Sequence, residues 1–373
     1  MSLPSVTDIT SELIKIPSVS DQGNVEITDW IHDFLLRQDF VVERLEYINP
    51  DDGKLKANLV ARKGEGSGGL GFFSHTDTVP GLEEEWQAFI PEVKDGKLYG
   101  RGSCDMKGPL AASVLAASSI DVFALKKPVY IVLTADEERG FYGAKHVISE
   151  SGFLSENWPD MGVVPEPTNL IPVYSHKGAY WHSITAHGVA AHTSTDKGIS
   201  SNFLIAPFLA EMAELKRQFL SEKTFMNDEF DPPTNGFNLT ITDYGCALNA
   251  TAAKTTCCVH FRSMPNVDNK AISEIILKRA EEYGFEVQTV ANDPFFSSPE
   301  SEIIKLSLEA TNETKAVTVP YGTEALFYGT KLPLVILGPG SIDQAHTVGE
   351  WIDISQLERS VNVYEKMIKR HCT

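Results

Sequence analysis

Short apolar runs alternate with amphipathic segments towards both ends of the chain. Runs bounded by turn-forming residues, typical of β-strands, lie at 41–47, 58–62, 70–73, 129–134, 161–165 and 334–337. Segments with apolar residues at helical spacing lie at 7–15, 27–35, 109–120, 140–150 and 355–370. The run at 129–134 is apolar throughout, as in a central strand covered on both faces. The pattern predicts an α/β fold with a central sheet flanked by helices.

The middle of the chain has a different order of elements. Strands are predicted at 180–186, 236–243, 255–262 and 285–290, and helices at 201–219 and 269–283. The order β-α-β-β-α-β is that of a ferredoxin-like unit. We therefore expect one α/β domain made of residues 1–178 and 292–373, interrupted by a smaller α+β domain at residues 179–291.

A glycine-rich loop at residues 64–69 separates two of the predicted strands. Such a loop can bind phosphate, but here no Lys-Ser/Thr pair follows it and the next element is a strand. The sequence therefore predicts a hairpin turn at this position.

Composition and charge exclude several classes of function. The 373 residues include 51 acidic and 32 basic side chains, and the net charge of −19 argues against a nucleic-acid partner. Nothing in the sequence approaches a membrane span, so no membrane partner is expected. The five cysteines are odd in number and lack C-x-x-C spacing, and the start of the chain lacks the pattern of a secretory signal. A cytoplasmic location with reduced thiols is expected.

Residues that can bind metal ions or move protons follow several of the predicted strands. They are His75, Asp77, Asp105, Glu137, Glu138, Glu166 and His346. In open α/β sheets ligands bind beyond the carboxyl ends of the strands, so these side chains are expected to converge. Asp105 has an alternative role as the cap of the buried helix that follows it. The paired glutamates have an alternative as a solvated loop, but a carboxylate at the exit of a buried strand is costly without a partner.

Imidazoles combined with carboxylates suit zinc, and also cobalt or manganese. Two such ions about 3.5–4 Å apart can share a bridging carboxylate and a water molecule, which they acidify. A glutamate beside the ligands can take a proton from that water and return it to a leaving amine. The sequence thus predicts a hydrolytic centre with two metal ions.

The motifs and their order resemble the M20 family of metallopeptidases and deacylases, over nearly the whole chain. By this resemblance Asp105 would bridge two divalent metal ions. His75 and Glu166 would complete one metal site, and Glu138 and His346 the other. The resemblance also implies a zinc-peptidase-like catalytic domain with a mixed central sheet, and a ferredoxin-like domain that acts as a lid and forms a homodimer.

Further roles follow from the same resemblance. Glu137 would be the general base, and Asp77 would be the partner that orients His75. The peptide bond between Asp105 and Met106 would be cis, which costs about 3 kcal/mol at a residue other than proline.

Three residues of the smaller domain match functional positions of the family. His192, in the segment 188–194, resembles a lid histidine that reaches into a partner subunit's site and stabilises an oxyanion. Asn249 and Arg262 resemble substrate-binding residues, and arginine can bind a carboxylate through two hydrogen bonds. A salt bridge at a strand edge is an alternative role for Arg262. The family often has aspartate where this chain has His260, which leaves the orientation of Arg262 open.

Local segments favour the acetylornithine deacetylase branch of the family. They lie at 166–170, 175–178, 322–325 and 338–346. Gly322, Thr323 and Glu324 are expected to bind substrate, with Glu324 either shaping a pocket near a cationic side chain or orienting its own loop.

The expected reaction is hydrolysis of an N-acyl amino acid, N-acetylornithine in particular, as in arginine biosynthesis. Related substrates of succinyl-diaminopimelate desuccinylases, dipeptidases and carboxypeptidases are alternatives. The alternative from a different class is a non-catalytic metal-bound scaffold. Loss of the general base or of a metal ligand would indicate such a scaffold, and this chain retains all of them.

Overall fold

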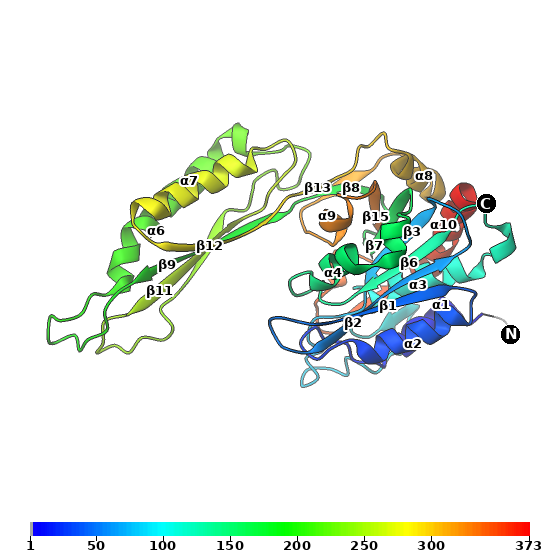
Figure 1. The fold of residues 1–373 in the computed structure, drawn as a ribbon, viewed down its shortest axis with the longest axis horizontal. Coiled ribbons are helices and arrows are strands. Elements are labelled where there is room, and N and C mark those ends of the chain that lie inside the picture. Colours follow the sequence, from blue (N-terminus) through cyan, green and yellow to red (C-terminus); the bar gives the residue numbers. More distant parts are fainter. Residues whose placement is uncertain (1–2) are drawn as a thin grey trace. The chain divides into compact units, whose positions relative to one another are not determined.

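The computed structural model describes residues 3–373, which form two compact units (Figure 1). The first contains the described part of Met1–Tyr174, together with Ser297–Val317 and Thr323–Thr373. The second contains Ser175–Phe296 and Thr318–Gly322, so it includes a short segment outside the expected range of 179–291. Each unit has its own hydrophobic core.

The first unit is built on a mixed sheet, which confirms the predicted fold class. Its strands are β1 (Val41–Ile48), β2 (Leu55–Lys63), β3 (Leu70–His75), β6 (Val129–Thr134), β7 (Met161–Pro167), β8 (Val173–His176) and β15 (Leu334–Gly338). Their order is β1-β2-β6-β3-β7-β15-β8. The central strands β6, β3, β7 and β15 run parallel, so their carboxyl ends meet at one edge of the sheet. β8 continues along the chain into the second unit, where it pairs with β13 (Phe295–Phe296), and β14 (Val317–Val319) also pairs with β8.

Helices cover both faces of this sheet. They are α1 (Val6–Ile14), α2 (Val25–Leu36), α3 (Lys107–Ser119), α4 (Tyr142–Glu150), α5 (Gly152–Glu156), α8 (Glu302–Thr311), α9 (Ala325–Tyr328) and α10 (Ile354–Cys372). Neighbouring residues of a strand point to opposite faces. Accordingly, Phe72 contacts Tyr364 of α10 and Phe73 contacts Tyr328 of α9, with ring centroids 5.2 and 4.4 Å apart. The alanine-rich helix α3 is buried on almost every side, as its sequence predicted.

The prediction of a hairpin at residues 64–69 was wrong. These residues connect β2 to β3, but β6 lies between the two strands in the sheet. β6 pairs antiparallel with β2 and parallel with β3. A hairpin signal reports only residues that are close in sequence, and the strand that fills the gap comes more than fifty residues later.

Two short strands after β3 and one before α10 form a separate small sheet. They are β4 (Glu92–Lys94), β5 (Lys97–Tyr99) and β16 (Trp351–Asp353), in the order β16-β5-β4. This sheet ties the residues that precede Asp105 to the residues that follow His346.

The second unit has the β-α-β-β-α-β order of a ferredoxin-like unit. Its main elements are β9 (Ala179–His187), α6 (Ser201–Ser221), β10 (Asn238–Thr242), β11 (Lys254–Phe261), α7 (Asn269–Glu282) and β12 (Glu286–Asn292). The strands are antiparallel in the order β10-β11-β9-β12. Residues of both helices share one core with the sheet, among them Phe208 and Ile276.

Three single turns of 3-10 helix complete the elements of the two units. They lie at Val122–Ala124, Lys223–Phe225 and Ile342–Gln344. No helix among the described residues is long and apolar enough to cross a membrane.

Candidate metal centre

His75 and Asp105 belong to the buried half of a cluster at the carboxyl ends of the parallel strands, whose other half includes the exposed His346. His75 is the last residue of β3, and Asp105 lies two residues before α3. Nε2 of His75 lies 3.2 Å from Oδ1 of Asp105 and 3.7 Å from Oε1 of Glu166 near the end of β7. Met106 occupies the cap position of α3, so Asp105 does not serve as the helix cap. The ligand atoms of His75, Asp105 and Glu166 lie within 4.8 Å of one another, close enough to surround one cation.

Glu138 and His346 lie around the other oxygen of Asp105. Nε2 of His346 is 3.0 Å from Oε1 of Glu138 and 3.3 Å from Oδ2 of Asp105. Asp105 therefore presents each of its two carboxylate oxygens to a different histidine, an arrangement suited to a carboxylate shared by two cations. The peptide bond between Asp105 and Met106 is cis, as expected.

Glu137 and Asp77 lie next to this cluster. Glu137 belongs with His75 and Glu138 to a third group whose ligand atoms lie within 4.8 Å of one another. The carboxylate of Asp77 accepts the backbone N–H groups of Glu137 and Glu138 at 3.2 and 3.3 Å, and the hydroxyl of Ser20 at 2.7 Å. Nδ1 of His75 lies 2.9 Å from the carbonyl oxygen of Asp77 and 3.6 Å from its carboxylate. Asp77 thus contacts His75 through its carbonyl oxygen and, at a longer distance, through its carboxylate, which also holds the glutamate loop.

The electrostatics of the cluster match a site for positive ions. Burial raises the pKa of Glu137 and of Glu166 well above the ordinary value, and nearby carboxylates raise them further. Hydrogen bonds to Asp105 and Glu138 raise the pKa of His346 to about 10. Several carboxylates in one buried region repel one another unless positive charge is supplied. The donor set of imidazoles and carboxylates therefore fits divalent cations such as zinc.

Two buried carboxylates that the sequence patterns did not single out hold the loops of the cluster. Asp136 has a positive φ of 61° directly before Glu137. It accepts hydrogen bonds from the hydroxyl of Tyr47 at 2.6 Å and the amide of Asn49 at 2.7 Å. Glu350 accepts the N–H of Asp105 at 3.0 Å. The only signal for Asp136 was its place in an acidic run, and Glu350 lies in no predicted element.

Glu324 belongs to the first unit and lies close enough to His75 and Asp77 to interact with their charges. It is buried, and the hydroxyl of Thr134, at the end of β6, lies 2.8 Å from both of its carboxylate oxygens. Burial raises its pKa to about 8. Thr323 is also buried, and its hydroxyl accepts the N–H of Ala325 at 3.1 Å. Gly322 belongs to the second unit, so the chain passes between the units directly before Thr323.

His192, Asn249 and Arg262 all lie in the second unit. His192 is bridged to Ala250, and the carbonyl oxygen of Asn249 accepts the N–H of Thr193 at 3.0 Å. Arg262 follows the last residue of β11, whereas Asn249 precedes the first. Asn249 lies in the loop five residues before β11, and the eight residues of this strand span roughly 26 Å at about 3.3 Å per residue. The structure therefore brings His192 and Asn249 together and separates both from Arg262.

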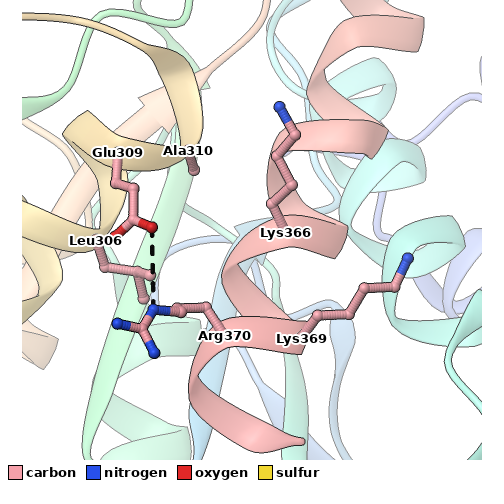
Figure 2. Close-up of a pocket in the computed structure, with 6 residues that line it drawn as sticks. All are labelled: Leu306, Glu309, Ala310, Lys366, Lys369 and Arg370. Carbon is pink, nitrogen blue, oxygen red and sulfur yellow. Dashed lines mark ion pairs between the residues drawn. The ribbon is translucent and has the colours of Figure 1, made fainter.

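A groove of about 380 Å³ between α8 and α10 contains none of the cluster residues (Figure 2). Arg370 and Glu309 form an exposed ion pair of 3.9 Å across it. Figure 2 shows the amino groups of Lys366 and Lys369 extending away from each other. Because its charged groups do not converge on one point, we assign no ligand to this groove.

Comparison with known proteins identifies the family of the chain. Residues 71–370 match the peptidase family M20/M25/M40. The chain is 34% identical to an acetylornithine deacetylase of Buchnera aphidicola, over 99% of each protein. It is 33% identical to an acetylornithine deacetylase of Pasteurella multocida, over 100% of this chain and 99% of the relative.

Solved structures of low sequence identity share the fold. An M20 family metallo-carboxypeptidase from Sulfolobus solfataricus matches with a TM-score of 0.74 at 16% identity, over 98% of this chain and 99% of the other. A tripeptidase from Staphylococcus aureus matches with a TM-score of 0.70 at 21% identity, over 98% of this chain and 97% of the tripeptidase.

The fold and the family match together define a hydrolase of the amidohydrolase and peptidase type. The chain belongs to peptidase family M20/M25/M40.

Proposed function

We propose that this chain is a deacylase with two divalent metal ions that removes the acyl group from an N-acyl amino acid, most specifically N-acetylornithine. The observation that carries the proposal is the position of Asp105, whose two carboxylate oxygens each face a histidine while Glu137 lies alongside. The full-length relatives named acetylornithine deacetylases support the choice of substrate.

The cluster around Asp105 supplies the ligands. In this proposal Asp105 would be shared between the two ions, His75 and Glu166 would complete one site, and Glu138 and His346 would complete the other. Zinc is the preferred metal, with cobalt or manganese as alternatives that the same donors accept. When bound, the ions acidify a water molecule and polarise the acyl carbonyl.

Glu137 performs the proton transfers in this mechanism. Burial raises its pKa, so it takes up a proton readily and is poised to carry it from the attacking water to the leaving amine. Asp77 accepts the backbone N–H of Glu137 at 3.2 Å and so limits the movement of its loop. His192 stabilises the oxyanion, and Arg262 pairs with the α-carboxylate of the substrate.

A homodimer through the second unit is part of the proposal. Arg262 and the bridge between His192 and Ala250 lie beyond opposite ends of β11, a strand about 26 Å long, so in this proposal one substrate does not contact Arg262 and His192 of the same second unit. A partner subunit would supply His192 and Asn249. The edge strand β10, the loop that follows it and the adjoining start of α6 carry exposed apolar side chains that suit such an interface, namely Ile241, Leu248 and Phe203. Phe203→Glu should convert a dimer to a monomer in light scattering, and a wild-type monomer would exclude this assembly.

We also infer a cytoplasmic role in arginine biosynthesis. All five cysteines are free, which suits a reducing compartment, and the bacterial relatives are named acetylornithine deacetylases, whose product would be ornithine.

A substrate panel with metal analysis tests the function. The purified protein, with its metal content measured, is assayed on N-acetylornithine, N-succinyl-diaminopimelate, neutral N-acetyl amino acids and dipeptides. We expect kcat/KM to be at least about tenfold higher for N-acetylornithine than for the others. Glu137→Gln, assayed in parallel, reports any contaminating hydrolase. A clear preference for dipeptides would favour the peptidase alternative, which the names of the structural relatives support.

A further inference from the structure

Glu350 is a fully buried carboxylate surrounded by hydrogen-bond donors of the loop that carries Asp105. Its Oε1 accepts the backbone N–H groups of Cys104 at 2.9 Å and Asp105 at 3.0 Å. Its Oε2 accepts the N–H of Gly102 at 3.0 Å and a guanidinium N–H of Arg101 at 2.8 Å. Four donors thus converge on the two oxygens of a side chain that is fully buried.

The hydrogen bonds of Glu350 and of its partner Arg101 link three segments that carry residues of the metal cluster. Glu350 lies four residues after His346 and directly before β16. Its partner Arg101 is also buried, and Nε of Arg101 donates to the carbonyl oxygen of Pro80 at 3.2 Å, in the loop that follows His75 and Asp77. The carbonyl of Glu350 accepts the N–H of Gly100 at 3.0 Å, which adds a main-chain link.

An ionised carboxylate suits this position because it can only accept hydrogen bonds, and all four neighbours donate. An amide of the same size would turn an N–H₂ group towards one pair of donors and leave them unpaired. Groups that orient metal ligands typically change metal affinity or activity by about 10- to 100-fold when they are replaced.

We propose that Glu350 is a positioning residue that fixes Asp105 in the orientation in which both of its oxygens bind metal. The inference rests on the proposed metal centre. Glu350 contacts the backbone N–H of Asp105 and none of the reacting groups, so it acts through Asp105. Because Glu350 and His346 share one short loop, the same contact also fixes the position of His346.

The test compares Glu350→Gln with a matched control, Glu43→Gln. Glu43 accepts donors in the same manner, from the hydroxyl of Ser151 and the N–H groups of Gly152 and Phe153, at 2.6, 2.8 and 3.3 Å. It holds the start of α5 and no ligand of the cluster. Metal-free protein is titrated with Zn²⁺ against a competing chelator, and with Co²⁺ while the visible absorption spectrum is recorded.

Glu350→Gln should weaken Zn²⁺ binding by about 10- to 100-fold and change the Co²⁺ spectrum, which reports ligand geometry. It should lower kcat at saturating metal more than it raises KM. Glu43→Gln should lower thermal stability while both metal measurements stay as in the wild type. If Glu350→Gln does not fold, Glu350→Asp serves instead: it keeps the charge but is one methylene shorter, and should give an intermediate loss.

The titrations distinguish a failure of the proposed metal centre from a failure of the proposed role of Glu350. If the unmodified protein binds neither Zn²⁺ nor Co²⁺, the metal centre itself is wrong. If it binds both, and the Glu350 variants keep wild-type affinity and spectrum, then only the positioning role of Glu350 is overturned.

Discussion

The acidic residues in and around the cluster differ in their hydrogen-bond partners. Asp77 and Glu350 accept backbone N–H groups, so their charge is satisfied by the protein itself. Asp105 and Glu138 face histidines instead. A metal ion can take the place of the proton between each histidine nitrogen and the carboxylate oxygen that it faces. A carboxylate with its lone pairs already used is a poor ligand. The hydrogen-bond partners, rather than burial alone, therefore separate ligands from the residues that hold them.

Glu137→Gln tests the division of roles between the adjacent glutamates. The amide keeps the size of the side chain and cannot accept the proton of an attacking water. We expect kcat to fall by about 10²- to 10⁴-fold, the usual contribution of a general base, with metal content unchanged. His75→Ala and Glu166→Ala should instead lower the metal content first, as measured by elemental analysis. An active Glu137→Gln enzyme would refute its role as the base.

Glu324→Gln separates the two roles considered for Glu324. Burial raises the pKa of this carboxyl to about 8, which favours its neutral form, and the carboxyl contacts the hydroxyl of Thr134. A neutral buried group orients a loop better than it attracts a cation. We therefore expect KM to change by the same factor for N-acetylornithine and for a neutral N-acetyl amino acid. A selective rise for the cationic substrate would show that Glu324 shapes its pocket.

At the scale of elements, the sequence predicted the site well wherever a ligand follows an apolar strand. His75, Glu138 and Glu166 were found because β3, β6 and β7 are continuous apolar runs whose ends can be located from the sequence. Glu350 was missed because it ends an irregular loop, and its partners are about 245 residues away in the chain. The hairpin at residues 64–69 failed for the same reason, since only long-range pairing inserts β6 between β2 and β3.

His182 on β9 makes the stability of the second unit depend on pH. Its Nδ1 lies 3.0 Å from the hydroxyl of Thr289 on β12, and its Nε2 3.3 Å from that of Ser273 on α7. Burial lowers its pKa from 6.5 to about 4. Between these values the unfolded chain binds the proton and the folded chain does not, so stability falls as pH is lowered from 6.5 to 4.

His182→Gln should remove this contribution. The free energy of unfolding is measured with denaturant between pH 4.5 and 7 and plotted against pH. The slope should be steeper for the wild type than for the variant, by an amount that corresponds to the uptake of up to about one proton on unfolding. His187→Gln is the control, because His187 is an exposed residue of the same strand. Equal slopes for wild type and His182→Gln would contradict the assignment.

At the scale of the whole molecule, the cluster joins segments that are otherwise distant in the chain. Its ligands come from the ends of β3, β6 and β7, from the start of α3 and from the loop after β15. All of them belong to the first unit, while the second unit has a core of its own. Bound cations would thus act as cross-links within one unit only.

Removal of the metal should therefore loosen the first unit selectively. A ligand present at a thousandfold excess over its dissociation constant stabilises the folded state by about 4 kcal/mol, and this is lost on chelation. In hydrogen exchange we expect protection to fall around His75, Asp105, Glu138 and His346 after chelation, and to return when Zn²⁺ is added. The core strands β9 and β11 serve as the internal control, since none of their residues is a ligand. A uniform loss of protection over both units, or none, would mean that cations do not hold these loops together.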